Sequence, residues 1–294
     1  MTDGVLVLTA TEREQADLFN WLEPGTVTSR FGRRWAEGTY GGRPIRLIET
    51  GVGAVNTAHT VTVALEYYSE RNPSGLLHGS ASGLPTNKSS TVSKNPRSLL
   101  RGRLQSAKPA FVLQIGIGGA YVSSGLAVGD LAIATEECYG DMGVLTPDGW
   151  RGMDFIGFPV VASDPPCFNR FSLNAALVKD TRRCLAAIDW EGSPPQIGVG
   201  PFVTVNQCSG VQVAGDAVAA RFGGICESME GAAAAHVCAL YGIPFVEVRC
   251  ISNLVEDRNF STWNIPLAMR RSQMAAKAVL DDHQGGSGIL PLCV

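Results

Sequence analysis

Short, almost entirely apolar runs alternate along this chain with glycine-bearing turns and with stretches of helical length. The strand candidates, rich in Val, Ile, Leu and Phe, are Val5–Leu8, Pro44–Glu49, Ala110–Ile115, Asp130–Ala134, Phe202–Val205 and Pro244–Ile251. One helix candidate begins near Glu12, and two others cover Val55–Glu70 and Met229–Tyr241. Strands that are apolar on both faces need helices on both faces. The pattern therefore predicts an α/β fold: a single three-layer α/β/α domain with a central mixed, twisted sheet.

Charge and hydropathy exclude several classes of protein. The 24 basic and 27 acidic side chains give a net charge of −3, too small an asymmetry to predict a nucleic-acid partner. No run approaches the ~18 consecutive apolar residues of a membrane helix. The first residues carry an acid where a secretory signal carries a base. We expect a cytoplasmic protein with no membrane partner.

The eight cysteines support the same compartment. None forms a CxxC pair, and no His/Cys cluster has the spacing of a zinc site. Several lie in apolar runs, where a free thiol behaves as a small hydrophobic group. We expect reduced, buried thiols and neither a metal nor a redox cofactor.

One segment, residues 71–108, departs from the alternating pattern. It holds eight Ser, three Pro, four Gly and seven basic residues, without an acidic or aromatic residue. The rest of the chain holds 17 basic and 27 acidic residues, so this segment offsets the charge of an acidic body. Such a composition is typical of a flexible loop inserted between two elements. A basic docking arm for an acidic partner is the alternative.

Glycine-rich turns are expected after three strands, at residues 51–56, 116–119 and 204–210. Their exposed backbone N–H groups suit anionic or sugar ligands. The first turn opens like a dinucleotide fingerprint, but Asn56 replaces its last glycine. None continues into the Gly-Lys-Ser/Thr of a phosphate-binding loop. Neither kind of nucleotide site is predicted.

Four polar residues stand where strands end or helices begin. Glu14 follows the first strand, Glu230 opens a helix of small residues, and Arg249 and Asn253 flank the end of the last strand. Each alone is typical of a cap or a surface residue. Because the sites of α/β proteins lie at the carboxyl ends of strands, together they predict one site.

These residues stand in segments that resemble the nucleoside phosphorylase and nucleosidase superfamily. The segments are 10–14, 50–56, 114–120, 228–233 and 249–253. They occur in family order and leave only the 71–108 insertion and the extreme C-terminus uncovered. The resemblance implies a nucleoside phosphorylase-like domain over residues 1–294 and a small-molecule nucleoside as substrate.

The resemblance also implies roles for single residues. Met229 and Glu230 match the pair that binds ribose, Glu14 matches the acid that activates water, and Asn253 matches the residue that engages the purine. Gly118, Asn206 and Ser209 match the walls of the base and sugar sites. Arg249 either anchors Glu230 or forms a plain structural ion pair.

Two positions favour hydrolysis of an inosine-type nucleoside. Phosphorylases of this superfamily bind phosphate through Arg, and the matching position is Gln114. Placing phosphate beside Glu14 without Arg would be unfavourable, so water is the expected nucleophile. Adenine-specific nucleosidases have Asp where this chain has Asn253. An amide can accept from a protonated N7 and donate to a 6-oxo group, which is complementary to hypoxanthine.

Within the superfamily, the chain most resembles the futalosine hydrolase family, on residues 141–150, 157–159, 204–206 and 251–258. That family cleaves futalosine to hypoxanthine and dehypoxanthine futalosine, on the bacterial route to menaquinone, without a cofactor. The resemblance implies a homo-oligomer, dimer or higher, in which residues 139–159 close the site of a partner subunit. A methylthioadenosine/adenosylhomocysteine nucleosidase, a purine nucleoside phosphorylase and a non-catalytic nucleoside-binding protein remain alternatives; an intact Glu14 argues against the last.

Overall fold

The computed structural model describes residues 4–71, 108–190 and 192–282. Its main sheet has ten strands within these ranges, in the order β11-β10-β6-β12-β5-β1-β4-β3-β2, with β9 paired to β6. The strands are β1 Val5–Thr9, β2 Glu23–Arg30, β3 Arg33–Tyr40, β4 Arg43–Glu49, β5 Phe111–Tyr121, β6 Leu131–Tyr139, β9 Arg170–Ser172, β10 Ile197–Thr204, β11 Cys226–Ser228 and β12 Phe245–Val255.

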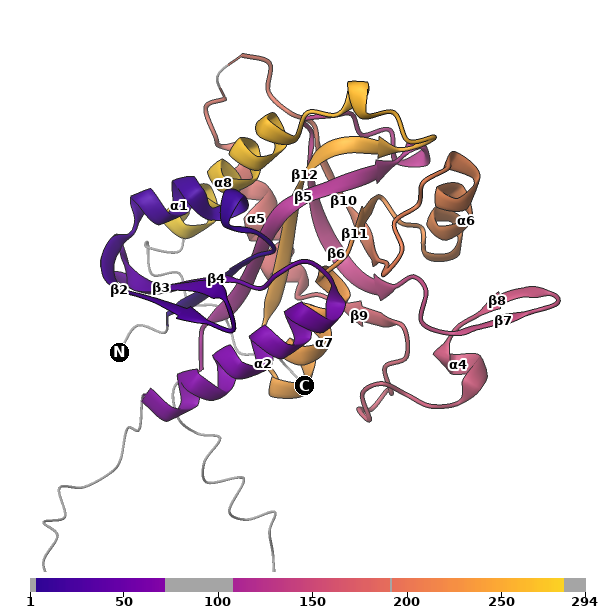
Figure 1. Cartoon of the computed structure of the whole chain (residues 1–294), viewed down its shortest axis with the longest axis horizontal. Coiled ribbons are helices and arrows are strands. Elements are labelled where there is room, and N and C mark those ends of the chain that lie inside the picture. The colour runs from indigo at the N-terminus through magenta and orange to yellow at the C-terminus, as the bar shows by residue number, and fades with distance from the viewer. Residues whose placement is uncertain (1–3, 72–107, 191, 283–294) are drawn as a thin grey trace, which may run out of the picture.

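Helices cover both faces of this sheet (Figure 1). The α-helices are α1 Ala16–Trp21, α2 Ala54–Arg71, α4 Met153–Ile156, α5 Ala175–Ala186, α6 Gln212–Phe222, α7 Gly231–Tyr241 and α8 Ile265–Asp282; the 3-10 helices are η1 Glu12–Gln15, η2 Val122–Ser124 and η3 Phe260–Thr262. Alternate residues of β1 show the three layers. Val5 and Val7 pack in a cluster with α1, α5 and α8, whereas Leu6 and Leu8 pack in a cluster with α2 and α7. The predicted α/β/α architecture is confirmed.

The sheet is mixed, as expected. β1, β5 and β12 run parallel, whereas β12 and β6 are antiparallel. An additional antiparallel pairing of β11 with β5 closes β5, β12, β6, β10 and β11 into a ring. Buried apolar side chains, Ala120, Phe202 and Ile251 among them, form a separate core within this part of the sheet. The closure brings the ends of β5, β11 and β12 to one place.

Three sequence expectations need correction. Residues 116–119 do not form a turn: β5 continues through them to Tyr121, because β12 and β11 pair with this stretch on its two sides. β12 likewise runs on to Val255, with an irregularity between Ile251 and Asn253. The helix expected from Glu12 begins as η1 and becomes α-helical only at Ala16.

The hairpin of β2 and β3 was not predicted, and it forms one edge of the sheet. All but the two end residues of the 71–108 insertion lie outside the described residues, so its character stays a prediction. The described cysteines are free, and five of the seven are buried; Cys208 is exposed. No helix in the described ranges is long and apolar enough to cross a membrane.

Candidate active site

A cavity of about 260 Å³ lies where β1, β5, β11 and β12 end. It is lined by seven of the eight predicted site residues: Glu14, Gly118, Ser209, Met229, Glu230, Arg249 and Asn253. These residues come from segments as far apart as η1 and β12. The fold therefore brings these seven residues together around one cavity.

Asn206 is the exception. Its backbone N–H and its side-chain amide both donate to the carboxylate of Asp141, at 2.6 and 3.1 Å, and the residue is exposed. It is not among the residues that line the cavity. Asn206 thus lies outside the cavity, bound to Asp141, which follows β6.

Glu14 is a buried carboxylate held by three donors. Its Oε2 accepts from the backbone N–H of Thr11 at 2.9 Å and from the Thr11 hydroxyl at 3.0 Å. Its Oε1 accepts from the backbone N–H of Ile117, in β5, at 3.0 Å. Burial raises the pKa of Glu14, against the opposing effects of Arg249 and the Ile117 N–H. A fixed carboxylate of raised pKa is suited to accept a proton near neutral pH.

Arg249 joins Glu230 to the interior of the sheet. Its Nη2 lies 3.1 Å from Oε2 of Glu230, its Nη1 donates to the carbonyl of Ile117 at 2.9 Å, and its Nε donates to Glu247. The other oxygen of Glu230 accepts from the backbone N–H of Gly53 at 2.8 Å. The turn at residues 51–53 thus orients the carboxylate through its backbone. Of the two readings of Arg249, the contacts favour the anchor of Glu230.

Behind Arg249, two further carboxyl groups face each other. Glu137 in β6 and Glu247 in β12 are both fully buried, and a Cβ at Gly231 would collide with both. No donor among the described residues reaches either oxygen of Glu137 or the Oε2 of Glu247. Burial and the neighbouring Glu247 raise the pKa of Glu137 well above its ordinary range. Glu137 therefore holds its proton more tightly than an exposed glutamate does.

Glu227 is a site residue that sequence reasoning missed. It lies in β11, is buried and lines the cavity. Its Oε1 accepts from the backbone N–H of Ser209 at 2.8 Å, and its Oε2 accepts from the hydroxyls of Ser209 and Tyr121 at 2.7 and 3.2 Å. The apolar-strand pattern cannot reveal it, because β11 is only three residues long.

At the end of β12, the amide of Asn253 is oriented by its neighbours. Its Oδ1 accepts from the hydroxyl of Ser252 at 2.7 Å, and its Nδ2 donates to the carbonyl of Leu254 at 3.0 Å. One N–H of Nδ2 and one lone pair of Oδ1 remain for a ligand. The half-buried side chain lines the cavity at the same end as Glu227.

Gln114, the position at which phosphorylases are expected to carry Arg, is turned away from the cavity. It is buried, and its Nε2 lies 3.5 Å from Glu247. Arg249 is the only buried Lys or Arg among the described residues. Its guanidinium is already engaged by Glu230 and Glu247.

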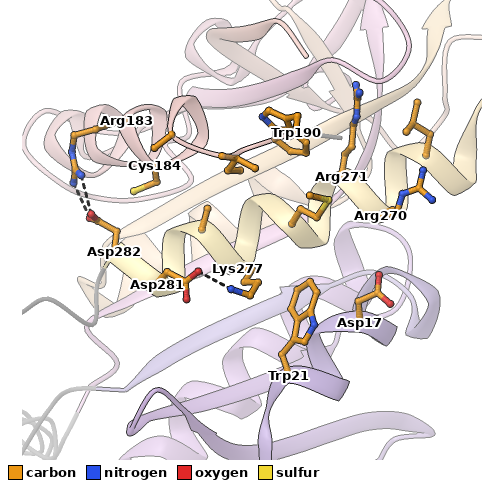
Figure 2. Close-up of a pocket in the computed structure, with 15 residues that line it drawn as sticks. Asp17, Trp21, Arg183, Cys184, Trp190, Arg270, Arg271, Lys277, Asp281 and Asp282 are labelled. Carbon is orange, nitrogen blue, oxygen red and sulfur yellow. Dashed lines mark hydrogen bonds and ion pairs between the residues drawn. The ribbon is translucent and has the colours of Figure 1, made fainter. Parts of the chain in front are cut away.

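A second, larger hollow of about 780 Å³ lies among α1, α5 and α8, whose side chains line it (Figure 2). Four of its charged side chains form two ion pairs: Arg183 with Asp282 at 2.7 Å, and Lys277 with Asp281 at 2.9 Å. Trp21 and Trp190 supply its aromatic lining. None of the predicted site residues lines it. Across the described ranges, no group of three or more His, Cys, Asp or Glu is placed to hold a metal ion.

The sequence model of the phosphorylase superfamily matches residues 5–281. The futalosine hydrolase of Thermus thermophilus is 28% identical over 239 residues, which are 81% of this chain and 82% of that protein. The futalosine hydrolase of Acidothermus cellulolyticus is 28% identical over 173 residues, 58% of this chain; the match spans 64% of that protein, less than two thirds of its length.

Among solved structures, the 5′-methylthioadenosine/S-adenosylhomocysteine nucleosidase of Neisseria meningitidis, in complex with methylthio-immucillin-A, has a TM-score of 0.71. The match covers 95% of this chain and 99% of that chain, at 18% sequence identity. This likeness establishes the fold.

Proposed function

The chain belongs to the phosphorylase superfamily, and on this premise we propose that it is an N-glycosyl hydrolase that cleaves futalosine to hypoxanthine and dehypoxanthine futalosine. Three of its relatives bear the name futalosine hydrolase. One observation carries the proposal: two buried carboxylates, Glu14 and Glu230, line one cavity, and the only buried cation described there is already paired with Glu230.

In the proposed reaction, Glu230 accepts hydrogen bonds from the ribose hydroxyls, with Met229 beside the sugar. The bond between C1′ and the purine nitrogen breaks, and its electron pair goes to the base, which takes a proton from solvent and leaves as neutral hypoxanthine. Asn253 stabilises the departing hypoxanthine through its amide. Glu14 orients water and takes its proton as the water oxygen attacks the oxocarbenium-like C1′. Gly118 and Ser209 supply the walls of the sugar and base sites.

Water is preferred to phosphate as the nucleophile because the cavity has no spare buried cation. A phosphate at C1′ would lie beside Glu14, whose charge would repel it. Gln114, turned toward Glu247, offers no cationic contact. These contacts support hydrolysis over phosphorolysis.

The base end supports hypoxanthine over adenine. Asn253 cannot transfer a proton to N7 of an adenine leaving group, and its amide complements the paired N7 and 6-oxo edge. An amide facing adenine would leave a hydrogen bond unmade in a buried pocket, which is costly. A methylthioadenosine nucleosidase is thus the second candidate, favoured by fold likeness and by sequence relatives of that name at 24–26% identity.

We also propose a homo-oligomer in which residues 139–159 cover the cavity of a partner. This segment forms a hairpin, β7 Val144–Thr146 and β8 Gly149–Arg151, and then α4; it projects beyond the rest of the fold (Figure 1). Leu145, Phe155 and Phe158 are 81%, 63% and 70% exposed there. A cluster of exposed large apolar side chains is typical of an interaction surface. The reaction is assigned to the cytoplasm, on the route to menaquinone.

Base release tests the proposal. Purified protein is incubated with futalosine, inosine and methylthioadenosine, with and without phosphate, and the free base is followed by chromatography. We expect hypoxanthine from futalosine, at a rate independent of phosphate. Cleavage that requires phosphate, or preferred release of adenine, would contradict it.

A further inference from the structure

The register of three strands places two polar side chains on either side of a glycine. Gly119 of β5 is paired with Glu227 of β11 on one side and with Asn253 of β12 on the other. Residues paired across neighbouring strands project to the same face of a sheet. Both side chains line the cavity. Because Gly119 has no side chain, a slot about two strand spacings wide, roughly 10 Å between the flanking Cα atoms, remains between them.

The carboxylate of Glu227 has one acceptor site left for a ligand. An ionised carboxylate offers about four lone-pair sites. The Ser209 N–H, the Ser209 hydroxyl and the Tyr121 hydroxyl occupy three of them. Burial and the charge of Glu227 raise the pKa of Tyr121, so its hydroxyl stays protonated and remains a donor. Three donors fix the carboxylate as an acceptor that faces the cavity.

We propose that Glu227 is the residue that selects a 6-oxopurine, by accepting the N1–H of the base while Asn253 engages its O6 and N7. The proposal rests on the proposed function, since it takes hypoxanthine as the leaving base. A 6-oxopurine carries a proton on N1, which the spare lone pair of Glu227 accepts. Adenine has a lone pair and no proton at N1, so N1 and the carboxylate of Glu227, both acceptors, would face each other without a hydrogen bond.

The slot makes this pairing geometrically specific. A purine presents N1, position 6 and N7 along one continuous edge, and the two flanking side chains stand at opposite sides of Gly119. A side chain at position 119 would enter the slot: its Cβ would already lie 3.2 Å from Nδ2 of Asn253. The carboxylate therefore adds a contact that Asn253 alone does not make, at the opposite end of the base edge.

The test compares the wild type with Glu227→Gln, on futalosine and on its 6-amino counterpart. A glutamine amide can donate to adenine N1, so we expect the kcat/KM preference for the 6-oxo substrate to fall by about 10–100-fold. Glu136→Gln is the matched control, because Glu136 is a partly buried carboxylate of the same sheet that pairs with Arg170 outside the cavity. An unchanged preference in folded Glu227→Gln would overturn the proposal.

Free-base binding separates this inference from the proposed function. Calorimetry with hypoxanthine and adenine needs no turnover, and the wild type should bind hypoxanthine at least about 10-fold more tightly. If it does so yet leaves futalosine intact, the function fails and the 6-oxopurine site stands. If futalosine is cleaved and Glu227→Gln binds both bases as the wild type does, the site fails alone. Should Glu227→Gln not fold, Tyr121→Phe removes one donor to the carboxylate and should reduce the preference about 3–10-fold; no reduction would contradict the proposal.

Discussion

The carboxylate of Glu14 and the guanidinium of Arg249 meet above Gly116, where β5 offers bare backbone. A Cβ at this position would lie 2.6 Å from Oε1 of Glu14 and 2.8 Å from Nη1 of Arg249. The proposed base and the anchor of the ribose-binding carboxylate thus occupy the volume that a side chain would fill. Their arrangement depends on one missing methyl group.

Gly116→Ala should displace Glu14 and lower kcat by at least about 10-fold, because small misplacements of a catalytic group are costly. The added methyl should also destabilise the fold by about 1–3 kcal/mol. Gly198→Ala is the control. Gly198 lies in β10, away from the cavity, and a Cβ at this position would lie 2.9 Å from the side chain of Leu126. It should lose comparable stability and keep kcat. If Gly116→Ala kept the same kcat as Gly198→Ala, the position of Glu14 above Gly116 would not matter for catalysis.

The pH dependence of the reaction should report Glu14. A base must be deprotonated, and burial raises the pKa of this carboxyl. Activity should therefore fall as the pH drops through that raised pKa, at a higher pH than for an exposed glutamate. Glu14→Gln should abolish turnover while retaining nucleoside binding, measured by calorimetry. A retained rate in Glu14→Gln would remove Glu14 from the mechanism.

The buried pair of Glu137 and Glu247 should make stability depend on pH. Because the folded state holds the Glu137 proton more tightly than the unfolded chain, its contribution is full below the unfolded pKa and is lost as the pH rises through the raised folded pKa. Glu137→Gln, which mimics the protonated acid, should flatten this alkaline loss in melting temperatures measured from pH 6 to 9. A loss as steep as in the wild type would place the proton elsewhere.

Arg249→Met should destabilise the protein by about 3–5 kcal/mol, because it leaves the buried carboxylates of Glu230 and Glu247 without their cation. The double variant Arg249→Met/Glu247→Met should recover part of this loss in urea unfolding. Arg183→Met removes an exposed partner of Asp282 and should leave the midpoint unchanged. If Arg183→Met shifted the midpoint as much as Arg249→Met does, the buried ion pairs of Arg249 would have no special role in stability.

Assembly can be tested on the projecting 139–159 segment. Replacing Leu145 and Phe158 by Ser should lower the mass found by light scattering and raise KM, because the proposed partner contact at the cavity is lost. Val213→Ser, on α6, changes a residue that is 76% exposed and should affect neither. A monomeric wild type would rule the assembly out.

Much of this fold could be predicted from the sequence because the local patterns of apolar residues match the elements that the whole fold requires. The apolar runs around Val5, Phe111 and Pro244 became buried parallel strands, and the helix expected from Met229 forms from Gly231. Glu14, Glu230, Arg249 and Asn253 meet in one cavity, since parallel strands bring their carboxyl ends together.

What could not be predicted depends on pairing between distant segments. Glycines in sequence suggested a turn at 116–119, yet partners on both sides keep β5 extended. Glu227 was missed because its strand is short and only the β11–β5 pairing aims it into the cavity. Asn206 was expected in the wall, but its partner Asp141 lies 65 residues away in sequence.

The glycines of β5 also set how this strand tolerates change. A methyl at Gly118 would meet Sγ of Cys226 at 2.5 Å, and one at Gly119 would meet Cγ2 of Val255 at 2.9 Å. With Gly116, each position is matched to a different neighbour, so substitutions at the three should not compensate for one another. In a survey of all single replacements, alanine, elsewhere the mildest change, should score here almost as poorly as a charged residue. The size of the side chain, and not its polarity, decides which residues these three positions tolerate.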